Sequence, residues 1–349
     1  MTKEEVLHFK QILAVLTLRS FGFGYFEIRH LPNTHRSRIK ASCYRTWQLG
    51  SDMIPWSLLD PHPLIPMTEI DQFESVFKSA GKTLFEHETV SIKKVFVISD
   101  GDQIASAKFL AICKAFFAVL GDQVQWQVVD GAQFDDASSM LKLVEQNTPD
   151  LICTHRYLHM QAREYPYSLG AYLDVLTQVS TMPILVMPRP ESISGDYPYT
   201  DTNRVMAITN QFTGDNHLAS YAARLTQPSG RLWLTHIEDQ ATLDRYLTTI
   251  SKIPEIDTDT ARKTLPEQLL KEPHDYIQSC REGLSKAGFN MEIESVVVMG
   301  HHLRDYKKLI EAHKIELLVL NTKDEGQLAM HGVAYSLTVE LRDIPMLLL

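Results

Sequence analysis

The chain has 349 residues, 44% of them apolar and 22% charged, which predicts a soluble globular protein with one or two hydrophobic cores. Its net charge of −9 argues against nucleic acid or an anionic membrane surface as a partner, because both are bound through fields of Lys and Arg. Membrane insertion is not expected either, since the longest apolar runs fall far short of the roughly 20 residues that a spanning helix needs.

The first 90 residues form an N-terminal extension or arm. Residues 4–16 and 68–87 have helical periodicity, residues 24–30 are a candidate strand, and residues 36–66 are rich in aromatic residues and proline. One interpretation is an arm that covers the following domain. The alternative is that residues 24–30 and 68–87 supply elements which that domain lacks.

Residues 91–188 form a first domain in which strands and helices alternate. The expected strands are residues 94–99, 124–129, 150–154 and 183–187, and the expected helices are residues 105–120, 137–146 and 169–179. Such short, continuously apolar strands are typical of a parallel sheet that is covered on both faces.

A linker at residues 189–203, rich in Pro, Ser and Asp, precedes a second domain at residues 204–349. Its expected strands are residues 204–209, 231–237, 291–298, 316–320 and 345–349. Its expected helices are residues 215–225, 303–313 and 333–341, with a long helical region at 240–286 that breaks near Pro254 and Pro273. The fold class is therefore α/β, with two tandem doubly wound parallel sheets of five-stranded type, the first one abbreviated. The first domain has no counterpart of the second strand and the long helix after it.

Both domains end in the same way. The stretch SLGAYLDVLTQVSTMPILVMP in the first is matched by HGVAYSLTVELRDIPMLLL in the second. Gly170 and Pro183 are separated by 13 positions, as are Gly332 and Pro345. An internal repeat of this kind indicates two related α/β units.

These units resemble universal stress protein domains. The resemblance rests on VISDGD at the end of the first strand, LTHIED in the second unit, VVVMG before its third helix, and the shared ending of Gly, short helix, Pro and apolar strand. It implies an adenine-nucleotide alpha-hydrolase-like fold, a strand order of 3-2-1-4-5 and pairing through fifth strands. It also implies a role in stress response.

Members of that family that bind ATP carry a G-x2-G-x9-G-(S/T) loop after the fourth strand. The first two glycine positions fall on His155 and Leu158 in the first unit and on Asn321 and Asp324 in the second. Side chains block the close backbone approach that phosphates require, so we expect no cofactor and no ATP site of the usual kind.

The remaining binding candidates are polar residues and glycines at strand ends, where doubly wound sheets hold ligands. In the first unit they are Asp100, Gly101, Asp130, Gly131, His155, Arg156 and Gly170, and in the second Asn210, Gly300, His301, Asn321 and Lys323. A His/Arg pair opposite two aspartates suits a small polar ligand, and His301 with Lys323 suits an anion. The alternative is a set of surface ion pairs and ordinary polar strand ends. His155 and His159 have the spacing of a two-His metal clamp but lack a third ligand, so no metal is expected.

No G-x-S-x-G, H-E-x-x-H or C-x-x-C motif occurs, which argues against an enzyme. We expect a non-catalytic protein that acts in stress response or regulation through protein partners. The alternative is a regulator that holds an adenine nucleotide through Asp100 and Arg156, and hydrolyses it slowly at most. A weaker idea is that residues 44–66 dock on a membrane transporter or another large partner.

Two further expectations concern the pairing of sheet edges and the location of the protein in the cell. The apolar strands at residues 183–187 and 345–349 suit a homodimer through sheet edges, or pairing with each other. Four scattered cysteines and the lack of a leader favour the cytoplasm.

Overall fold

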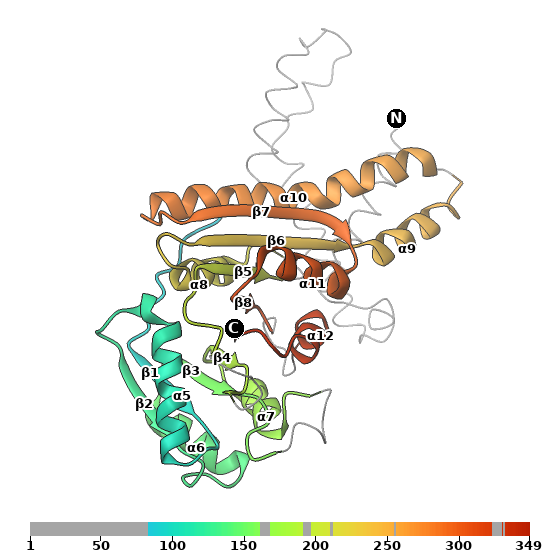
Figure 1. The fold of residues 1–349 in the computed structure, drawn as a ribbon. Coiled ribbons are helices and arrows are strands. Elements are labelled where there is room, and N and C mark those ends of the chain that lie inside the picture. Colours follow the sequence, from blue (N-terminus) through green and yellow to red (C-terminus); the bar gives the residue numbers. More distant parts are fainter. Residues whose placement is uncertain are drawn as a thin grey trace, which may run out of the picture. The chain divides into compact units, whose positions relative to one another are not determined.

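A nine-stranded sheet runs through the described part of the chain, with strand order β2-β1-β3-β4-β9-β8-β5-β6-β7 (Figure 1). The computed structural model describes residues 83–160, 168–190, 197–209, 212–254, 256–322, 330 and 332–349. Neighbouring strands are parallel except β4 and β9. The expected α/β fold with a largely parallel, doubly wound sheet is confirmed, but the two halves share one sheet.

The elements of the first half follow the predicted alternation. They are β1 (Lys94–Ile98), α5 (Gln103–Phe116), a short 3-10 turn η2 (Ala118–Leu120), β2 (Gln125–Val129), α6 (Ala137–Asn147), β3 (Leu151–His155), α7 (Ala171–Val179) and β4 (Ile184–Met187). Asp102 begins α5 by accepting a hydrogen bond from the backbone N–H of Ala105 at 2.8 Å. Asp136 begins α6 in the same way, through the N–H of Ser139. Such caps satisfy donors that a helix start leaves free.

The place of β2 corrects one expectation. Its whole length pairs with β1, from Lys94 opposite Gln125 to Ile98 opposite Val129. The first half therefore has a second strand, and what it lacks among the described residues is a counterpart of the third strand and of the long helix before it. Consecutive strands joined by one helix usually lie next to each other in a parallel sheet. The strand after α5 therefore pairs with β1.

The second half contains the complete unit. Its elements are β5 (Arg204–Ile208), α8 (Asn216–Leu225), β6 (Arg231–Asp239), α9 (Gln240–Ile250), α10 (Thr258–Lys286), β7 (Glu292–Gly300), α11 (His302–His313), β8 (Leu317–Leu320), α12 (Gly332–Glu340) and β9 (Met346–Leu348). In order along the sheet these strands are the third, second, first, fourth and fifth of the unit, as expected.

The long helical region breaks near Pro254, as predicted, but the break expected near Pro273 is wrong. Helix α10 continues through both Pro266 and Pro273. Pro273 and the following Tyr276, Ile277 and Cys280 are buried. Packing of this face against the sheet outweighs the backbone hydrogen bond that each proline removes.

Strands β4 and β9 join the two halves. They are antiparallel, with Leu185 opposite Leu347 and Ile184 opposite Leu348. Strand β9 also pairs with β8 on its other side, through Val319 and Leu347. The two edges considered for a homodimer are therefore occupied by each other, and they offer no free edge to a second copy.

Two core clusters lie on the two faces of the sheet. Helices α5, α8 and α10 contribute to one cluster, which contains Val95, Val97 and Leu347. Helices α6, α7, α11 and α12 contribute to the other, which contains Phe96 and Ile98. Alternate residues of one strand thus enter opposite cores, as the pleat requires. Both clusters draw residues from both halves, so the halves are stabilised together.

The described end of the N-terminal region packs on the second half. The backbone N–H of Phe85 donates to Ser279 Oγ at 2.9 Å, and that of Glu88 donates to Ser220 Oγ at 3.0 Å. Residues 83–87, expected to end a helix, are not helical. These contacts lie on α8 and α10, whereas an arm over the first domain was expected.

The other expectations for residues 1–82 lie outside the described residues. Where the structure describes the chain, no helix is both long and apolar enough to cross a membrane.

Candidate functional site

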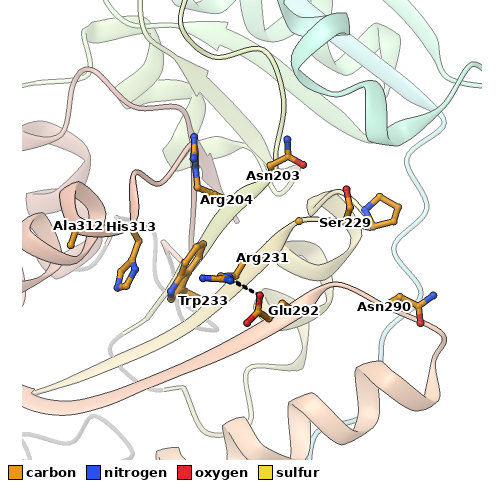
Figure 2. Close-up of a pocket in the computed structure, with 11 residues that line it drawn as sticks. Asn203, Arg204, Ser229, Arg231, Trp233, Asn290, Glu292, Ala312 and His313 are labelled. Atoms are coloured by element: carbon orange, nitrogen blue, oxygen red, sulfur yellow. Dashed lines mark hydrogen bonds and ion pairs between the residues drawn. The ribbon is translucent and has the colours of Figure 1, made fainter.

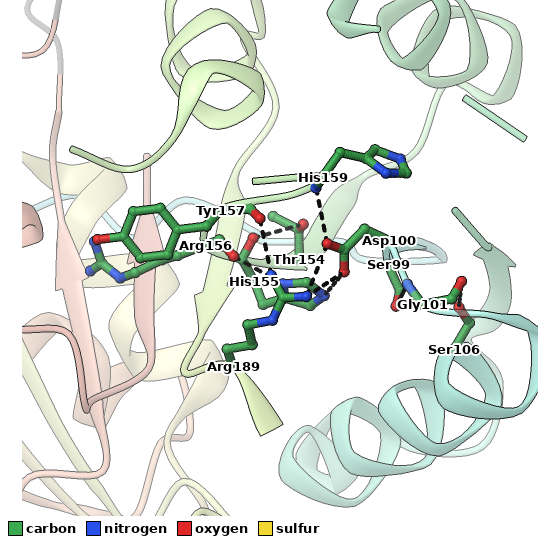
Figure 3. A network of polar contacts seen from close by, with 10 residues as sticks. All are labelled: Ser99, Asp100, Gly101, Ser106, Thr154, His155, Arg156, Tyr157, His159 and Arg189. Carbon is green, nitrogen blue, oxygen red and sulfur yellow. Dashed lines mark hydrogen bonds and ion pairs between the residues drawn. The ribbon is translucent and has the colours of Figure 1, made fainter. Parts of the chain in front are cut away.

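A buried ion-pair network surrounds Asp100 at the carboxyl ends of β1 and β3 (Figure 3). Asp100 Oδ1 lies 3.2 Å from His155 Nε2, and Oδ2 lies 3.0 Å from Arg189 Nη2. The backbone N–H of His159 donates to Oδ2 at 2.9 Å. The Asp100 side chain is only 8% exposed and that of His155 only 2%. Both carboxylate oxygens are therefore already bonded within the chain.

The partners of Asp100 are themselves fixed. Arg189 Nη1 donates to the Tyr157 carbonyl at 3.0 Å. His155 Nδ1 lies 3.1 Å from the Arg156 carbonyl, so both ring nitrogens of His155 face acceptors.

The environment lowers the pKa of Asp100. Burial raises it, but hydrogen bonding and charge from His155, the His159 N–H and the Arg189 charge together outweigh burial and hold the pKa of this carboxyl well below its usual range. The group is thus an ionised aspartate paired with two side chains.

The sequence predicted that Asp100 and His155 meet, and the structure brings them together. The arginine in the network, however, is Arg189 from the expected linker and not Arg156. Figure 3 shows Arg156 on the side of the network away from Asp100. Its Nη2 donates to the Leu341 carbonyl of the second half at 3.1 Å, and burial lowers the pKa of its guanidinium to about 10. The available signal for Arg189 was an arginine two residues after the end of a strand.

The other first-half candidates serve the local backbone. Asp130 Oδ1 accepts from the N–H of Ala132 and closes a turn. Gly131 donates its N–H to the Gly101 carbonyl at 2.9 Å, and a Cβ at Gly131 would lie 2.3 Å from the Asp100 carbonyl oxygen. Close contact between two loops is thus sufficient to explain Gly131.

Gly170 and Gly332, at equivalent places in the repeat, are predicted to respond differently to alanine. Gly170 has φ 94° and ψ 148°, a region that is essentially restricted to glycine, and a Cβ there would lie 3.0 Å from Tyr157 Cα. A Cβ on Gly332 would meet nothing within 4 Å. We expect Gly170→Ala to lower the free energy of unfolding by about 1–3 kcal/mol and Gly332→Ala to change it by less than about 0.5 kcal/mol. Urea unfolding measures the free energies of both variants. Equal effects would contradict the conclusion that only Gly170 needs a glycine.

The corresponding edge of the second half carries a different pair. Asn321 Nδ2 donates to Asp215 Oδ2 at 3.0 Å, and Asp215 also accepts from the N–H of Leu218 as the cap of α8. Burial raises the pKa of Asp215, and these hydrogen bonds only partly offset that effect.

Of the remaining second-half candidates, the structure describes Gly300 and His301. The N–H of His301 donates to Asp305 Oδ2 at 2.8 Å, and a Cβ on Gly300 would contact the same oxygen. Asn210 and Lys323 lie outside the described residues.

The two histidines at metal-clamp spacing have different partners. His155 faces Asp100, while the ring of His159 packs on Phe134 with ring centroids 4.8 Å apart. Within the described ranges, no group of three or more His, Cys, Asp or Glu side chains is arranged to hold a metal ion.

A cavity of about 330 Å³ adjoins the network. Ser99, Lys108, Phe109, His155 and Pro190 are among its lining residues. It lies at the carboxyl end of β1, the edge where doubly wound sheets commonly hold ligands.

The fold and site define an α/β protein with a doubly wound sheet and a buried aspartate that is paired within the chain at the carboxyl ends of the strands. No family profile and no curated protein sequence matches the chain. Solved structures match it at low identity.

A functionally unknown protein of Pseudomonas aeruginosa PAO1 is 12% identical over 74% of this chain and 92% of its own, with a TM-score of 0.42. A putative universal stress protein of Pseudomonas aeruginosa UCBPP-PA14 is 11% identical over 74% and 93%, with a TM-score of 0.43. A universal stress protein of Archaeoglobus fulgidus DSM 4304 is 12% identical over 74% and 86%, with a TM-score of 0.40. These likenesses concern the fold alone.

Proposed function

We propose that this chain is a non-catalytic, universal stress-type protein that acts in stress response or regulation by binding protein partners. The proposal rests mainly on Asp100, whose carboxylate at the carboxyl end of β1 is already bonded within the chain. His155, Arg189 and the His159 N–H use both oxygens of Asp100. A ribose hydroxyl would have to displace one of these partners, which would then lose its hydrogen bond to the carboxylate.

The loop after β3 supports the same conclusion. Leu158, at the second glycine position of the nucleotide-binding loop, is fully buried in the core with Phe96 and Ile152. An apolar side chain in this place supplies neither the space nor the backbone donors that bind phosphates.

A strand at the edge of the described sheet favours a protein partner. Strand β7 lies at the end of the described sheet, spans Glu292–Gly300 and carries Val298, which is 41% exposed. Unpaired N–H and C=O groups along such an edge can accept a strand from another protein.

The alternative function is a regulator that binds an adenine nucleotide in the first half. The cavity beside His155 favours it, because Lys108 offers a charge for a phosphate and Phe109 an aromatic surface. Asp100 would then have to exchange a present partner for the nucleotide.

Thermal unfolding of the full chain with ATP, ADP, AMP and cyclic dinucleotides separates the two functions. We expect no shift in melting temperature, whereas a ligand at 100-fold over its dissociation constant would add about 2.7 kcal/mol to the free energy of unfolding. Lys108→Met tests the cavity, and Lys142→Met, on the exposed face of α6, is the matched control. A nucleotide shift that Lys108→Met removes and Lys142→Met keeps would overturn the proposal in favour of the alternative.

A further inference from the structure

A second cavity, of about 580 Å³, lies at the amino ends of β5, β6 and β7, and not at the carboxyl ends where Asp100 is found (Figure 2). The start of each of these strands contributes one charged lining residue: Arg204, Arg231 and Glu292. His313, from the last turn of α11, closes another side. Because it is at the opposite edge of the sheet, this cavity is independent of the site discussed above.

Trp233 gives the cavity a fixed wall. Its side chain is buried in the second core cluster. Its ring lies 5.0 Å from that of His313 between centroids, and the guanidinium carbon of Arg231 lies 5.6 Å from the ring centroid. Figure 2 shows His313 and Arg231 on either side of the indole. The cation–π contact holds the Arg231 side chain in place while leaving its outer N–H groups accessible.

Both arginines have N–H donors that their carboxylate partners do not use. Arg231 Nε donates to Glu292 Oε2 at 2.8 Å, and Arg204 pairs with Glu316. A guanidinium has five N–H donors, and one carboxylate uses only part of them. Arg204 Nε is buried and has no hydrogen-bond partner. The Arg204 and Arg231 side chains remain 43% and 45% exposed, so a ligand can reach them.

The rest of the lining is polar and includes one carboxylate. Asn203, Ser229 and Asn290 bring two amide NH₂ groups and a hydroxyl, and Glu292 is the single carboxylate among the lining residues. Arg231 is paired with Glu292 and Arg204 with Glu316, and each guanidinium has N–H donors that its carboxylate does not use. These remaining donors suit a ligand that is rich in acceptors and negatively charged. Guanidinium groups bind such oxyanions in two-point contacts.

We propose that this cavity binds a small organic oxyanion, a phosphate ester or a polycarboxylate, through Arg231 and Arg204. The volume is within the range of small-molecule sites. Asn290 and Ser229 complete the contacts at the rim, and Trp233 holds Arg231 and His313 in place beneath the ligand.

Calorimetric titration of the full chain at constant ionic strength tests the proposal, with inorganic phosphate, glucose 6-phosphate, citrate and uncharged glucose as probes. We expect at least one oxyanion to bind at millimolar concentrations or below, and glucose not to bind. Arg231→Gln should weaken that oxyanion about tenfold. Arg304→Gln is the matched control, because Arg304 is an exposed arginine paired with Asp305 outside the cavity. It should bind like the wild type.

Two further readouts place the binding. Ser229→Trp, in an exposed turn at the rim, should block binding without touching the core. In protein labelled with 5-fluorotryptophan, the fluorine resonance assigned to Trp233 should move on titration. The proposal is wrong if no oxyanion binds, if Arg304→Gln weakens binding as much as Arg231→Gln, or if binding leaves the Trp233 resonance unmoved.

Discussion

Leu347→Ala is expected to lower the free energy of unfolding by about 2–5 kcal/mol, the usual cost of a cavity left by a buried leucine. Leu347 is fully buried in β9, between Leu185 of β4 and Val319 of β8. Its core cluster contains residues of both halves, so the cavity should destabilise both together. Urea unfolding measures the loss. Val298→Ala, at the exposed edge of the sheet, is the control and should cost less than about 0.5 kcal/mol.

The same variant distinguishes one cooperative sheet from two. Native-state hydrogen exchange should become faster in β1 and in β5 by similar factors, because the most protected amides exchange through global unfolding. Faster exchange in β5 with β1 unchanged would show that the two halves unfold separately.

Asp100→Asn should cost about 2–4 kcal/mol of stability. The change removes the negative charge from the buried network and leaves His155 and Arg189 without a carboxylate. Arg189 is partly exposed, and water reduces the loss on its side. Asp122→Asn, the same chemical change at an exposed turn, should be within about 0.5 kcal/mol of the wild type.

The cost of Asp100→Asn should depend on pH in a defined direction. The pKa of Asp100 is lowered in the folded state, so its contribution to stability is fully present above the ordinary aspartate pKa of 3.8. That contribution is lost as the pH falls below this value toward the folded-state pKa. The free energies of unfolding of wild type and variant should therefore converge below about pH 4. A difference that stays constant down to the lowest measurable pH would contradict the ion-pair assignment.

Most of the fold follows from local patterns that the sequence displays. Short apolar runs such as residues 94–99 and 204–209 match β1 and β5, and helical periodicity located α5, α8 and α11. What local patterns do not carry is the order in which strands pair. The place of β2 beside β1 and the antiparallel pairing of β4 with β9 depend on contacts between distant segments. The helix break predicted near Pro273 was wrong for a similar reason, because burial against the sheet outweighs the local effect of the proline.

The candidate site was predictable only where strand ends supply its residues. Asp100 lies two residues after the end of β1, and His155 is the last residue of β3. These strands are parallel neighbours, so a contact between the two side chains could be expected. Which way Arg156 points depends on the loop behind it, where Tyr157 has φ 58°, and periodicity does not encode that turn. The cavity at the amino ends was missed because Arg204, Arg231 and His313 are far apart in the sequence and match no motif.

The most direct test of the claim that the partners of Asp100 exclude a nucleotide is a crystal structure of the full chain grown with excess ATP. We predict Asp100 bonded to His155 and Arg189, with no nucleotide density beyond the carboxyl end of β1. Nucleotide density there, with Arg189 displaced and Asp100 bonded to the ribose, would contradict the account.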